Sequence, residues 1–588
     1  MQSKKYNIIS AAYFCFRYAP KAASIKLLIE LLNGALAPLI VIIVASFINN
    51  AILYVNGEEV LLQLIIAIVL LASFYAYSQI NQIIIRLADK SLENALKENL
   101  RLELIQKQAN ISYKYLENPE TLDLISHVCN NAEAQVMAIL ASGLRLVRIA
   151  IQTIGVFLLL ITYIWWIIPV FVLSTIPILF ISSKSGHKIY DIFKNSTKLT
   201  RKHYYLSSVL VGRETAAERT LFGYADSINS KFSETHIRRS NLVTKAIAIE
   251  ETSIQACSLI LNVIVIIASF ALLGSLSDGT LSHGMYVSLV GALIGISRLI
   301  SGMLSPLVRD ATEYAKYMQD FTRFFSLPEI DDIDSSNNSL IFESLEIRNL
   351  CFRYTESSPY VLNGLSLSME KGKSYSLIGQ NGAGKSTLTK ILLGLYRDFE
   401  GKILINGIDI SEYTTGELRR IFSVVYQDFA KYYIPLKNNI EFGNVQGDLS
   451  SALKLAELED VVVKLPKKEN TPLSKIYEDG VDISGGEWQK IAIARALYAN
   501  AAFMILDEPT ASLSPMMESK LYKRFGEITK DKTSLLISHR LGSTKLSDLL
   551  FVLDNGRVAE TGTHDKLMAA KGIYADMFLN QRSWYDER

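Results

Sequence analysis

The sequence predicts an α-helical membrane domain with six transmembrane helices and long cytoplasmic extensions, followed by a soluble α/β domain. The chain has 588 residues, more than one ordinary domain accommodates. Residues 1–325 hold long uncharged apolar stretches, whereas short β-rich runs alternate with helical patterns in 341–588. Residues 326–340 are polar and acidic and lack periodicity, which predicts a linker between the two domains.

The overall composition excludes several classes of protein. Lys and Arg number 60 against 58 Asp and Glu, and this net charge of +2 predicts no strong attraction to nucleic acid. Because 49% of the residues are hydrophobic, global disorder is excluded. The cysteines lie far apart, without a C-x-x-C motif, so we expect isolated reduced thiols rather than a zinc site: Cys15, Cys129, Cys257 and Cys351.

Uncharged stretches long enough to cross a bilayer define the membrane domain. A helix needs about 20 apolar residues to span the hydrocarbon core. The stretches are Leu31–Gly57, Val60–Ile85, Ile149–Ser183, Thr252–Ser277 and Gly279–Ser297. The third is too long for one ordinary span, and Tyr163–Trp166 followed by Pro169 predicts an interfacial turn inside it. Splitting it gives six spans.

The basic residues predict the orientation of these spans. The connections 86–135 and 184–249 carry six and twelve Lys or Arg residues, whereas the other three connections carry none. The positive-inside rule therefore places both termini and both basic connections in the cytoplasm. Residues 86–108 and 185–208 are rich in helix formers and lack Pro, so we expect the spanning helices to continue beyond the bilayer. Separate surface helices are the alternative.

A glycine-rich loop predicts a phosphate-binding site in the soluble domain. It follows an expected strand, 374–378, and fits the Walker A pattern G-x-x-x-x-G-K-[ST]. Backbone N–H groups of such a loop wrap phosphates, and the N-terminus of the next helix favours negative charge. Lys385 would reach the β- and γ-phosphates and Ser386 would hold Mg²⁺. The loop and the residue after it are Gly379, Gln380, Asn381, Gly382, Ala383, Gly384, Lys385, Ser386 and Thr387.

Two further motifs suit the same chemistry. Phe503–Glu508 is an apolar strand that ends in two acids, of which Asp507 suits the Mg²⁺ shell and Glu508 suits the base that orients the attacking water. Ser484-Gly485-Gly486-Glu487 precedes a helical pattern and predicts a second anion site at a helix N-terminus. Each motif is weak alone and gains weight beside the phosphate-binding loop.

One motif resembles the signature of ABC transporter ATPases. It is Ser-Gly-Gly-Glu, placed between a phosphate-binding loop and the sequence Leu506-Asp507-Glu508-Pro509-Thr510. With six expected spans before it, the chain resembles an exporter-type half-transporter over essentially its whole length. The resemblance implies that 341–588 is an α/β P-loop ABC ATPase domain with ATP and Mg²⁺ as cofactors. The run Gly485–Lys490 further resembles bacterial exporters of lantibiotic-type peptides.

The same resemblance assigns roles to further residues. Tyr354 matches the aromatic residue that stacks on adenine, Gln427 the glutamine that touches Mg²⁺ or water, and His539 the switch histidine on the γ-phosphate. Ser484 and Gly485 match residues that contact ATP held by another subunit, which implies a dimer. Glu117–Thr121 and Thr215–Gly223 fall where family members place coupling helices.

Two positions depart from the family pattern. Ile483 replaces the usual leucine, and Ser514 stands where the D-loop aspartate is expected, at the seam between subunits. Glu508, Gly485 and His539 are intact, so the chain does not resemble the degenerate half of an asymmetric pair. A homodimer is favoured, and a heterodimer with a homologous half-transporter is the alternative.

The sequence contains few residues that indicate which substrate is transported. Arg145 and Arg148 share a face of the third expected span and Arg298 lies on the sixth, where they would hold an anionic headgroup or a peptide carboxylate. Snorkelling or ion pairing between helices is the structural alternative. We expect an exporter of a peptide or amphipathic compound in the plasma (inner) membrane. The alternatives are a lipid or glycolipid flippase and an ATP-gated membrane regulator or channel.

Overall fold

The computed structural model describes residues 5–195, 197–213, 215–330, 341–442, 447–508, 532–538, 544–545 and 547–586, without the side chains of 189–190, 193–195, 197–198, 200 and 582–586. The chain divides into two compact units. The first comprises Met1–Ile111 and Tyr115–Pro328, and the second comprises Ser112–Lys114 and Glu329–Arg588.

The first unit consists of helices. Within the residues that the structure describes, six helices are long and apolar enough to cross a membrane: Pro20–Val55, Leu61–Ala109, Ala132–Ile164, Ile167–Lys188, Ala225–Ser277 and His283–Phe325. Its described helices are α1 (Ile8–Tyr18), α2 (Pro20–Val55), α3 (Leu61–Ala109), α5 (Pro119–Cys129), α6 (Ala132–Ile164), α7 (Ile167–Asn195), α8 (Thr197–Val211), α9 (Ala216–Phe222), α10 (Ala225–Ser277), α11 (His283–Leu299), the π-helical segment η1 (Ile300–Leu304) and α12 (Ser305–Phe325). The short helix α4 (Tyr113–Leu116) is divided between the two units after Lys114. The six predicted spans are confirmed, and α6 and α7 are separated at Trp165–Trp166, inside the expected turn.

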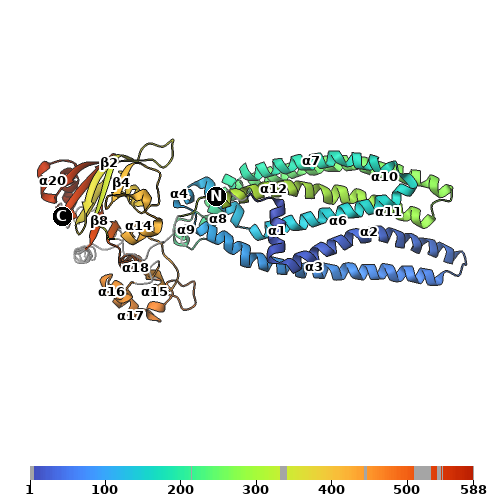
Figure 1. Cartoon of the computed structure of the whole chain (residues 1–588), viewed down its shortest axis with the longest axis horizontal. Helices are drawn as coiled ribbons and strands as arrows, with labels where there is room; N and C mark the ends of the chain where they lie inside the picture. The colour runs from blue at the N-terminus through green and yellow to red at the C-terminus, as the bar shows by residue number, and fades with distance from the viewer. Residues whose placement is uncertain are drawn as a thin grey trace. The chain divides into compact units, whose positions relative to one another are not determined.

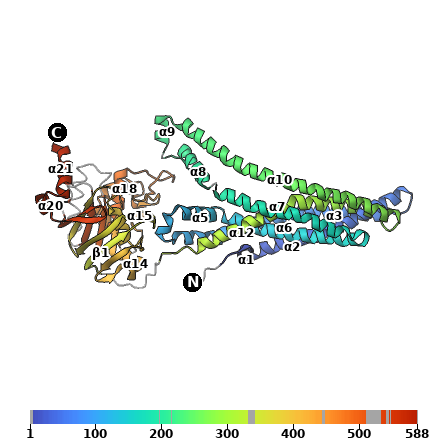
Figure 2. The same cartoon turned by 90° about the horizontal axis from the view of Figure 1, so that it is seen from above.

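The helices are longer than the apolar stretches in the sequence. At 1.5 Å per residue, α3 is about 70 Å long, roughly twice the hydrocarbon thickness. It runs without a break through 86–108, so the predicted extension of this span is confirmed. Long helices lie side by side in the pairs α2–α3, α2–α6, α7–α10 and α10–α11 (Figure 1). Figure 2 shows α8, α9 and the adjoining part of α10 diverging from α6 and α12.

Polar pairs join neighbouring spans of the first unit. Asn81 Nδ2 donates to Asn33 Oδ1 at 2.8 Å, which links α3 to α2. The hydroxyls of Ser182 and Ser305 lie 2.6 Å apart and are fully buried between α7 and α12. Because unsatisfied polar groups are costly in hydrocarbon, such pairs stabilise specific helix contacts.

The described residues of the second unit form two sheets. The first is antiparallel, in the order β2-β1-β4-β5, with β1 (Ser344–Phe352), β2 (Leu362–Glu370), β4 (Glu400–Ile405) and β5 (Ile408–Asp409). The second has the order β10-β9-β3-β8-β7-β6 and is parallel except for its β9–β10 hairpin. Its strands are β3 (Ser374–Gly379), β6 (Phe422–Val425), β7 (Phe503–Asp507), β8 (Thr533–Ile537), β9 (Leu549–Asp554) and β10 (Arg557–Gly562).

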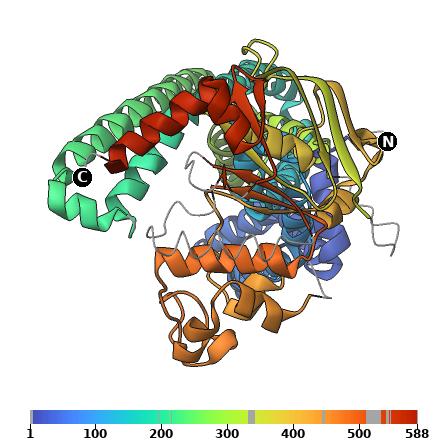
Figure 3. The same cartoon turned by 90° about the vertical axis from the view of Figure 1, so that its left-hand side faces the viewer.

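Helices accompany these strands. They are α13 (Lys385–Leu392), α14 (Thr415–Ile421), α15 (Leu436–Ile440), α16 (Leu449–Leu455), α17 (Glu459–Lys464), α18 (Gly485–Tyr498), α20 (His564–Ala570) and α21 (Ile573–Asp586), with short 3₁₀ segments Ile410–Glu412 and Lys468–Asn470. In Figure 3 the helices around α18 form an orange group beside the yellow and red strands. This group has its own hydrophobic core, in which Leu436, Leu458 and Ile491 are fully buried.

Buried apolar runs explain the central strands. Every residue of β7 and β8 is buried, as expected for parallel strands covered on both faces. The expected strands 374–378, 503–506, 534–537 and 549–553 are confirmed to within one residue at each end. Asn555 and Gly556 turn from β9 to β10 with φ of 48° and 75°, the backbone that a two-residue hairpin loop requires.

Candidate functional site

The strand order brings the sequence motifs to one edge of the parallel sheet. The glycine-rich loop follows β3, Gln427 follows β6, and Asp507 ends β7 with Glu508 as the next residue. Because β3, β8, β7 and β6 run parallel and adjacent, their carboxyl ends lie at the same edge. Open α/β sheets bind ligands at this edge.

Two glycines shape the phosphate-binding loop. Gly382 and Gly384 have φ of 84° and 101°, a backbone that L side chains rarely adopt. Gly384 is the residue before α13, and a Cβ there would lie 2.6 Å from Leu362 Cδ2. The predicted strand–loop–helix context is therefore present.

A Gly384→Ala replacement is expected to destabilise the second unit by about 2 kcal/mol and to weaken ATP binding. Alanine would be strained at this φ and would push Leu362 away from the loop. Thermal unfolding and titration with a fluorescent ATP analogue measure both effects. Gly364→Ala is the matched control, because Gly364 has φ of 80° and open space around its Cβ direction. Equal loss of ATP affinity in both variants would contradict the steric argument.

Lys385 is held against its own loop. Its side chain is 7% exposed, and Nζ donates to the carbonyls of Gly379 at 2.8 Å and Gln380 at 3.0 Å. Burial lowers the pKa of Lys385, although the nearby carboxylates of Glu508 and Asp507 act in the opposite direction. The amine therefore stands between the loop and the acidic end of β7.

Asp507 and Glu508 occupy different environments. Asp507 is 4% exposed, and its pKa is raised, first by burial, while a hydrogen bond from the Ser386 hydroxyl acts against the rise. The next residue, Glu508, has φ of 47°, and its backbone N–H donates to the carbonyl of Ile537 on β8 at 2.9 Å. Such a left-handed backbone is uncommon for glutamate, and the contact with β8 holds it.

Tyr354 and Gln427 lie on either side of the loop in the sequence and have different surroundings. The Tyr354 hydroxyl lies 2.9 Å from Thr387 Oγ1, and its ring packs edge-on against Tyr396 at 5.5 Å. The Tyr354 side chain stays 40% exposed, so it retains surface for a stacking ligand. Gln427 is exposed, two residues after the end of β6.

Ser484 and Glu487 form the N-terminal capping box of α18. The hydroxyl and backbone N–H of Ser484 donate to Glu487 Oε2 at 2.8 and 2.7 Å. Gly485 is exposed and Gly486 is half-buried, and a Cβ on Gly485 would meet no atom within 4 Å. The capping box explains the serine and glutamate locally, whereas the open space at Gly485 leaves room for a ligand. His539 and Ser514 lie outside the described residues.

Comparison with known proteins identifies the family. Residues 362–511 match the family described as ABC transporter. The chain is 29% identical over 498 residues to the subtilin transport ATP-binding protein SpaT of Bacillus subtilis, covering 81% of this chain and 79% of that protein. It is 30% identical over 492 residues to the ATP-dependent lipid A-core flippase of Pseudoalteromonas translucida, covering 81% and 82%. The chain belongs to the ABC transporter family.

The fold of this transporter is also found in a solved structure. It is similar to a bacterial Atm1-family ABC exporter with ATP bound, with a TM-score of 0.76 and 22% identity, over 95% of this chain and 98% of the other. The protein is a multi-pass membrane exporter of the half-transporter type whose ATPase domain binds nucleotide and couples ATP hydrolysis to transport.

Sequence reasoning missed two neighbours of the nucleotide site. Asp428, next to Gln427, raises the pKa of Asp507 through its negative charge, so the Gln427–Asp428 segment lies close to the end of β7. Tyr396 supports the Tyr354 ring from a position 42 residues further along the chain. Asp428 could have been found from the sequence, because it is an acidic residue directly next to the expected site glutamine. The contact of Tyr396 with Tyr354 depends on the fold alone.

Proposed function

We propose that this transporter moves a peptide or amphipathic compound out of the cytoplasm by alternating access in a homodimer. ATP binding would close two ATPase domains on each other, and the extended helices would transmit that closure to the membrane spans. Hydrolysis would reset the cycle. Residues 1–325 form the membrane domain in this proposal, 326–340 the linker and 341–588 the ATPase domain.

The nucleotide site suits ATP with Mg²⁺. The Ser386 hydroxyl and the Asp507 carboxylate are hydrogen-bonded to each other, and oxygen donors of this kind are the ligands that Mg²⁺ prefers. Bound Mg²⁺ would neutralise charge on the phosphates. Lys385 would exchange its loop carbonyls for phosphate oxygens, and Glu508 would orient the attacking water. Gln427 would contact the metal or water, and His539 would contact the γ-phosphate.

A second copy would complete each nucleotide site. Ser484, Gly485 and Gly486 stand at the exposed start of α18, which supports contact with ATP held by the other chain's phosphate-binding loop. A homodimer is favoured because Glu508, Gly485 and His539 are all present in this chain. Ser514 at the expected subunit seam would weaken communication between the two sites. The distribution of Lys and Arg supports an inner-membrane location with a cytoplasmic ATPase domain.

One of the three arginines expected to hold an anionic headgroup or a peptide carboxylate is neutralised by a neighbouring helix. Arg148 Nη1 lies 3.0 Å from Glu30 Oε2, and both side chains are mostly buried, so this arginine is neutralised within the protein. This ion pair removes one of the three arginines expected to hold an anion. The other two, Arg145 on α6 and Arg298 at the end of α11, are exposed.

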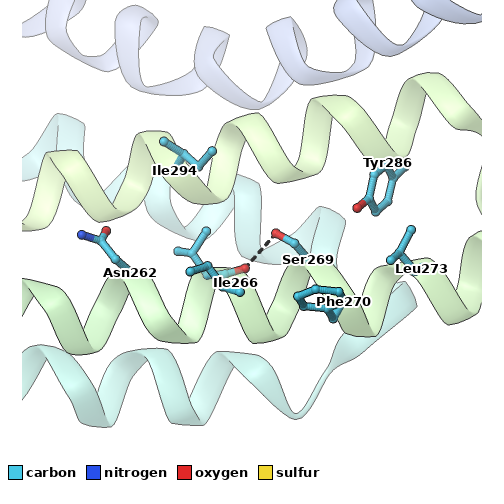
Figure 4. A pocket seen from close by; sticks show the side chains of 8 residues that line it. Asn262, Ile266, Ser269, Phe270, Leu273, Tyr286 and Ile294 are labelled. Carbon is cyan, nitrogen blue, oxygen red and sulfur yellow. Dashed lines mark hydrogen bonds between the residues drawn. The ribbon is translucent and has the colours of Figure 1, made fainter.

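A cavity in the membrane unit carries the proposal of a peptide or amphipathic cargo. It has a volume of about 290 Å³ between α10 and α11, and none of its eight lining side chains carries a charge (Figure 4). Asn262, Ser269 and Tyr286 supply polar atoms among apolar neighbours such as Phe270. Amide and hydroxyl groups in an apolar lining suit the carbonyls and apolar side chains of a peptide.

A lipid flippase is the second candidate, because relatives that match most of the chain are lipid A-core flippases. The test is the ATPase activity of the purified chain in lipid nanodiscs, with Glu508→Gln as the control. Cyclic peptides, linear peptides of the same composition and lipid A are added in turn.

Stimulation by a peptide class and not by lipid A is the expected result. Stimulation by lipid A alone would replace peptide export with lipid flipping. Glu508-dependent activity that moves no cargo into sealed vesicles would favour a channel or regulator. A folded chain that binds ATP and hydrolyses none would overturn the homodimer and point to a second half-transporter.

A further inference from the structure

A buried chain of hydrogen bonds in the second unit belongs to none of the nucleotide-site motifs. The hydroxyl of Tyr574 on α21 lies 2.8 Å from Thr544 Oγ1 and 2.7 Å from Nδ1 of His564, the first residue of α20. Tyr574 and Thr544 are both fully buried. These bonds therefore join the two C-terminal helices to the segment between β8 and β9.

Tyr574 is held in place on its own side of this chain. Its backbone N–H and that of Ile573 donate to the two carboxylate oxygens of Glu560 on β10, at 3.1 and 2.6 Å. Its ring packs in a small core with Val552 of β9 and with Ile378, the residue that directly precedes the phosphate-binding loop. The Tyr574 hydroxyl therefore has a fixed place relative to the parallel sheet that carries the nucleotide site.

Thr544 stands at the far end of the segment that carries His539. At the near end, β8 stops at Ile537, whose carbonyl accepts from the backbone N–H of Glu508 at 2.9 Å. At the far end, Thr544 begins a turn in which its carbonyl accepts from the Ser547 N–H at 3.2 Å. β8 sets where the segment starts but not the direction in which it continues, because five residues of chain can reach roughly 17 Å. The second anchor, at Thr544, limits where His539 can lie.

The Tyr574 hydroxyl can satisfy both of its neighbours, because a phenol is both a donor and an acceptor. Burial and the positive charge of Lys545 lower the pKa of His564, while Asp565 acts in the opposite direction. The imidazole is then neutral at neutral pH and can accept the Tyr574 proton at Nδ1, which leaves the phenol oxygen to accept from the Thr544 hydroxyl. Phenylalanine would fill the same space and remove both bonds.

We propose that Tyr574 is a positioning residue for ATP hydrolysis, which acts through Thr544 to hold His539 where it can contact the γ-phosphate. This inference rests on the proposed function in one respect, the contact of His539 with the γ-phosphate. It adds that α20 and α21 serve the nucleotide site through a hydrogen bond and not through packing alone. Turnover should therefore fall in a variant that keeps the fold.

The test measures ATP hydrolysis by the full-length chain carrying Tyr574→Phe, with Tyr413→Phe as the matched control. Tyr413 is 8% exposed, and its hydroxyl donates to the carbonyl of Ile405 in the antiparallel sheet at 3.1 Å. Both variants remove a buried hydroxyl, so both are expected to lower the Tm to a similar extent. We expect Tyr574→Phe to lower kcat by about 10-fold while KM for ATP changes by less than about threefold. Tyr413→Phe is expected to keep the wild-type kcat.

Two further variants show whether the effect passes through Thr544 and His539. Thr544→Val is expected to lower kcat as Tyr574→Phe does, and combining the two is expected to add no further loss, because both remove the same bond. In a His539→Ala background, Tyr574→Phe is expected to change the residual single-turnover rate by less than about twofold. Multiplied losses in either combination, or a KM that rises in step with the fall in kcat, would overturn the inference.

Hydrogen exchange in the nucleotide-free chain provides a readout that needs no turnover. Residues 538–544 are expected to exchange faster in Tyr574→Phe than in the wild type, whereas residues 379–387 exchange at the same rate in both. Unchanged exchange of 538–544, or a normal kcat in Tyr574→Phe beside an inactive His539→Ala, would overturn this inference alone. Wild-type turnover in His539→Ala would instead contradict the proposed role of His539. A wild-type chain without ATPase activity would contradict the proposed homodimer, and the exchange data would then decide whether Tyr574 anchors the segment.

Discussion

Replacing Glu508 by glutamine is expected to lower the rate of ATP hydrolysis by about 10³-fold while ATP remains bound. The backbone at Glu508 has φ of 47° and is held by the carbonyl of Ile537, so the side chain starts from a fixed position at the end of β7. Glutamine keeps the shape and a hydrogen-bonding amide but cannot accept a proton from water. Phosphate release measures the rate, and a fluorescent ATP analogue measures the binding.

A variant of the neighbouring residue Asp507 tests whether Glu508 acts as a proton acceptor or only adds negative charge to the site. Asp507→Asn removes charge from a buried side chain that bonds Ser386, so we expect it to weaken Mg²⁺-dependent binding as well as turnover. Glu508→Gln is expected to spare that binding. Wild-type turnover in Glu508→Gln would refute the assignment of Glu508 as the base.

Replacing Lys385 by methionine is expected to weaken ATP binding by about 100-fold, or about 3 kcal/mol. Lys385 is 7% exposed and donates to the carbonyls of Gly379 and Gln380, so its amine is already positioned inside the loop that would hold the phosphates. Methionine fills a similar volume without a charge. The fold is expected to survive, because the variant relieves the cost of a buried cation, while charge-assisted bonds to phosphate are lost.

Lys373→Met is the control for this variant. Lys373 is on the surface beside β3, 52% exposed, and pairs with Glu370 at 2.6 Å. Exposed pairs contribute little to stability, so the control should bind ATP as the wild type does. Isothermal titration with MgATP measures the affinities, and circular dichroism checks the fold. Equal affinity in Lys385→Met and Lys373→Met would exclude the proposed phosphate contact.

The examples of Arg148 and Tyr574 show why some site features escape sequence analysis. Arg148 was one of three arginines in apolar surroundings, and the sequence left both an anion site and an ion pair open. Its contact with Glu30 on α2 depends on how α2 and α6 pack, which no local pattern specifies. Tyr574 lies inside an ordinary helical run, and its partner Thr544 is 30 residues earlier.

The sequence by itself determined the six spans, the central strands and the glycine-rich loop of this transporter. Each is encoded in contiguous residues, through the apolar length that a bilayer requires, the buried runs of parallel strands and the left-handed backbone at Gly382 and Gly384. Only the tertiary structure decided which of these segments meet. The strand order placed Lys385 beside Asp507 and Glu508, the loop geometry joined Tyr354 to Thr387, and helix packing neutralised Arg148. The physical reason is that such contacts depend on the packing of the whole unit, because they join residues distant in the chain.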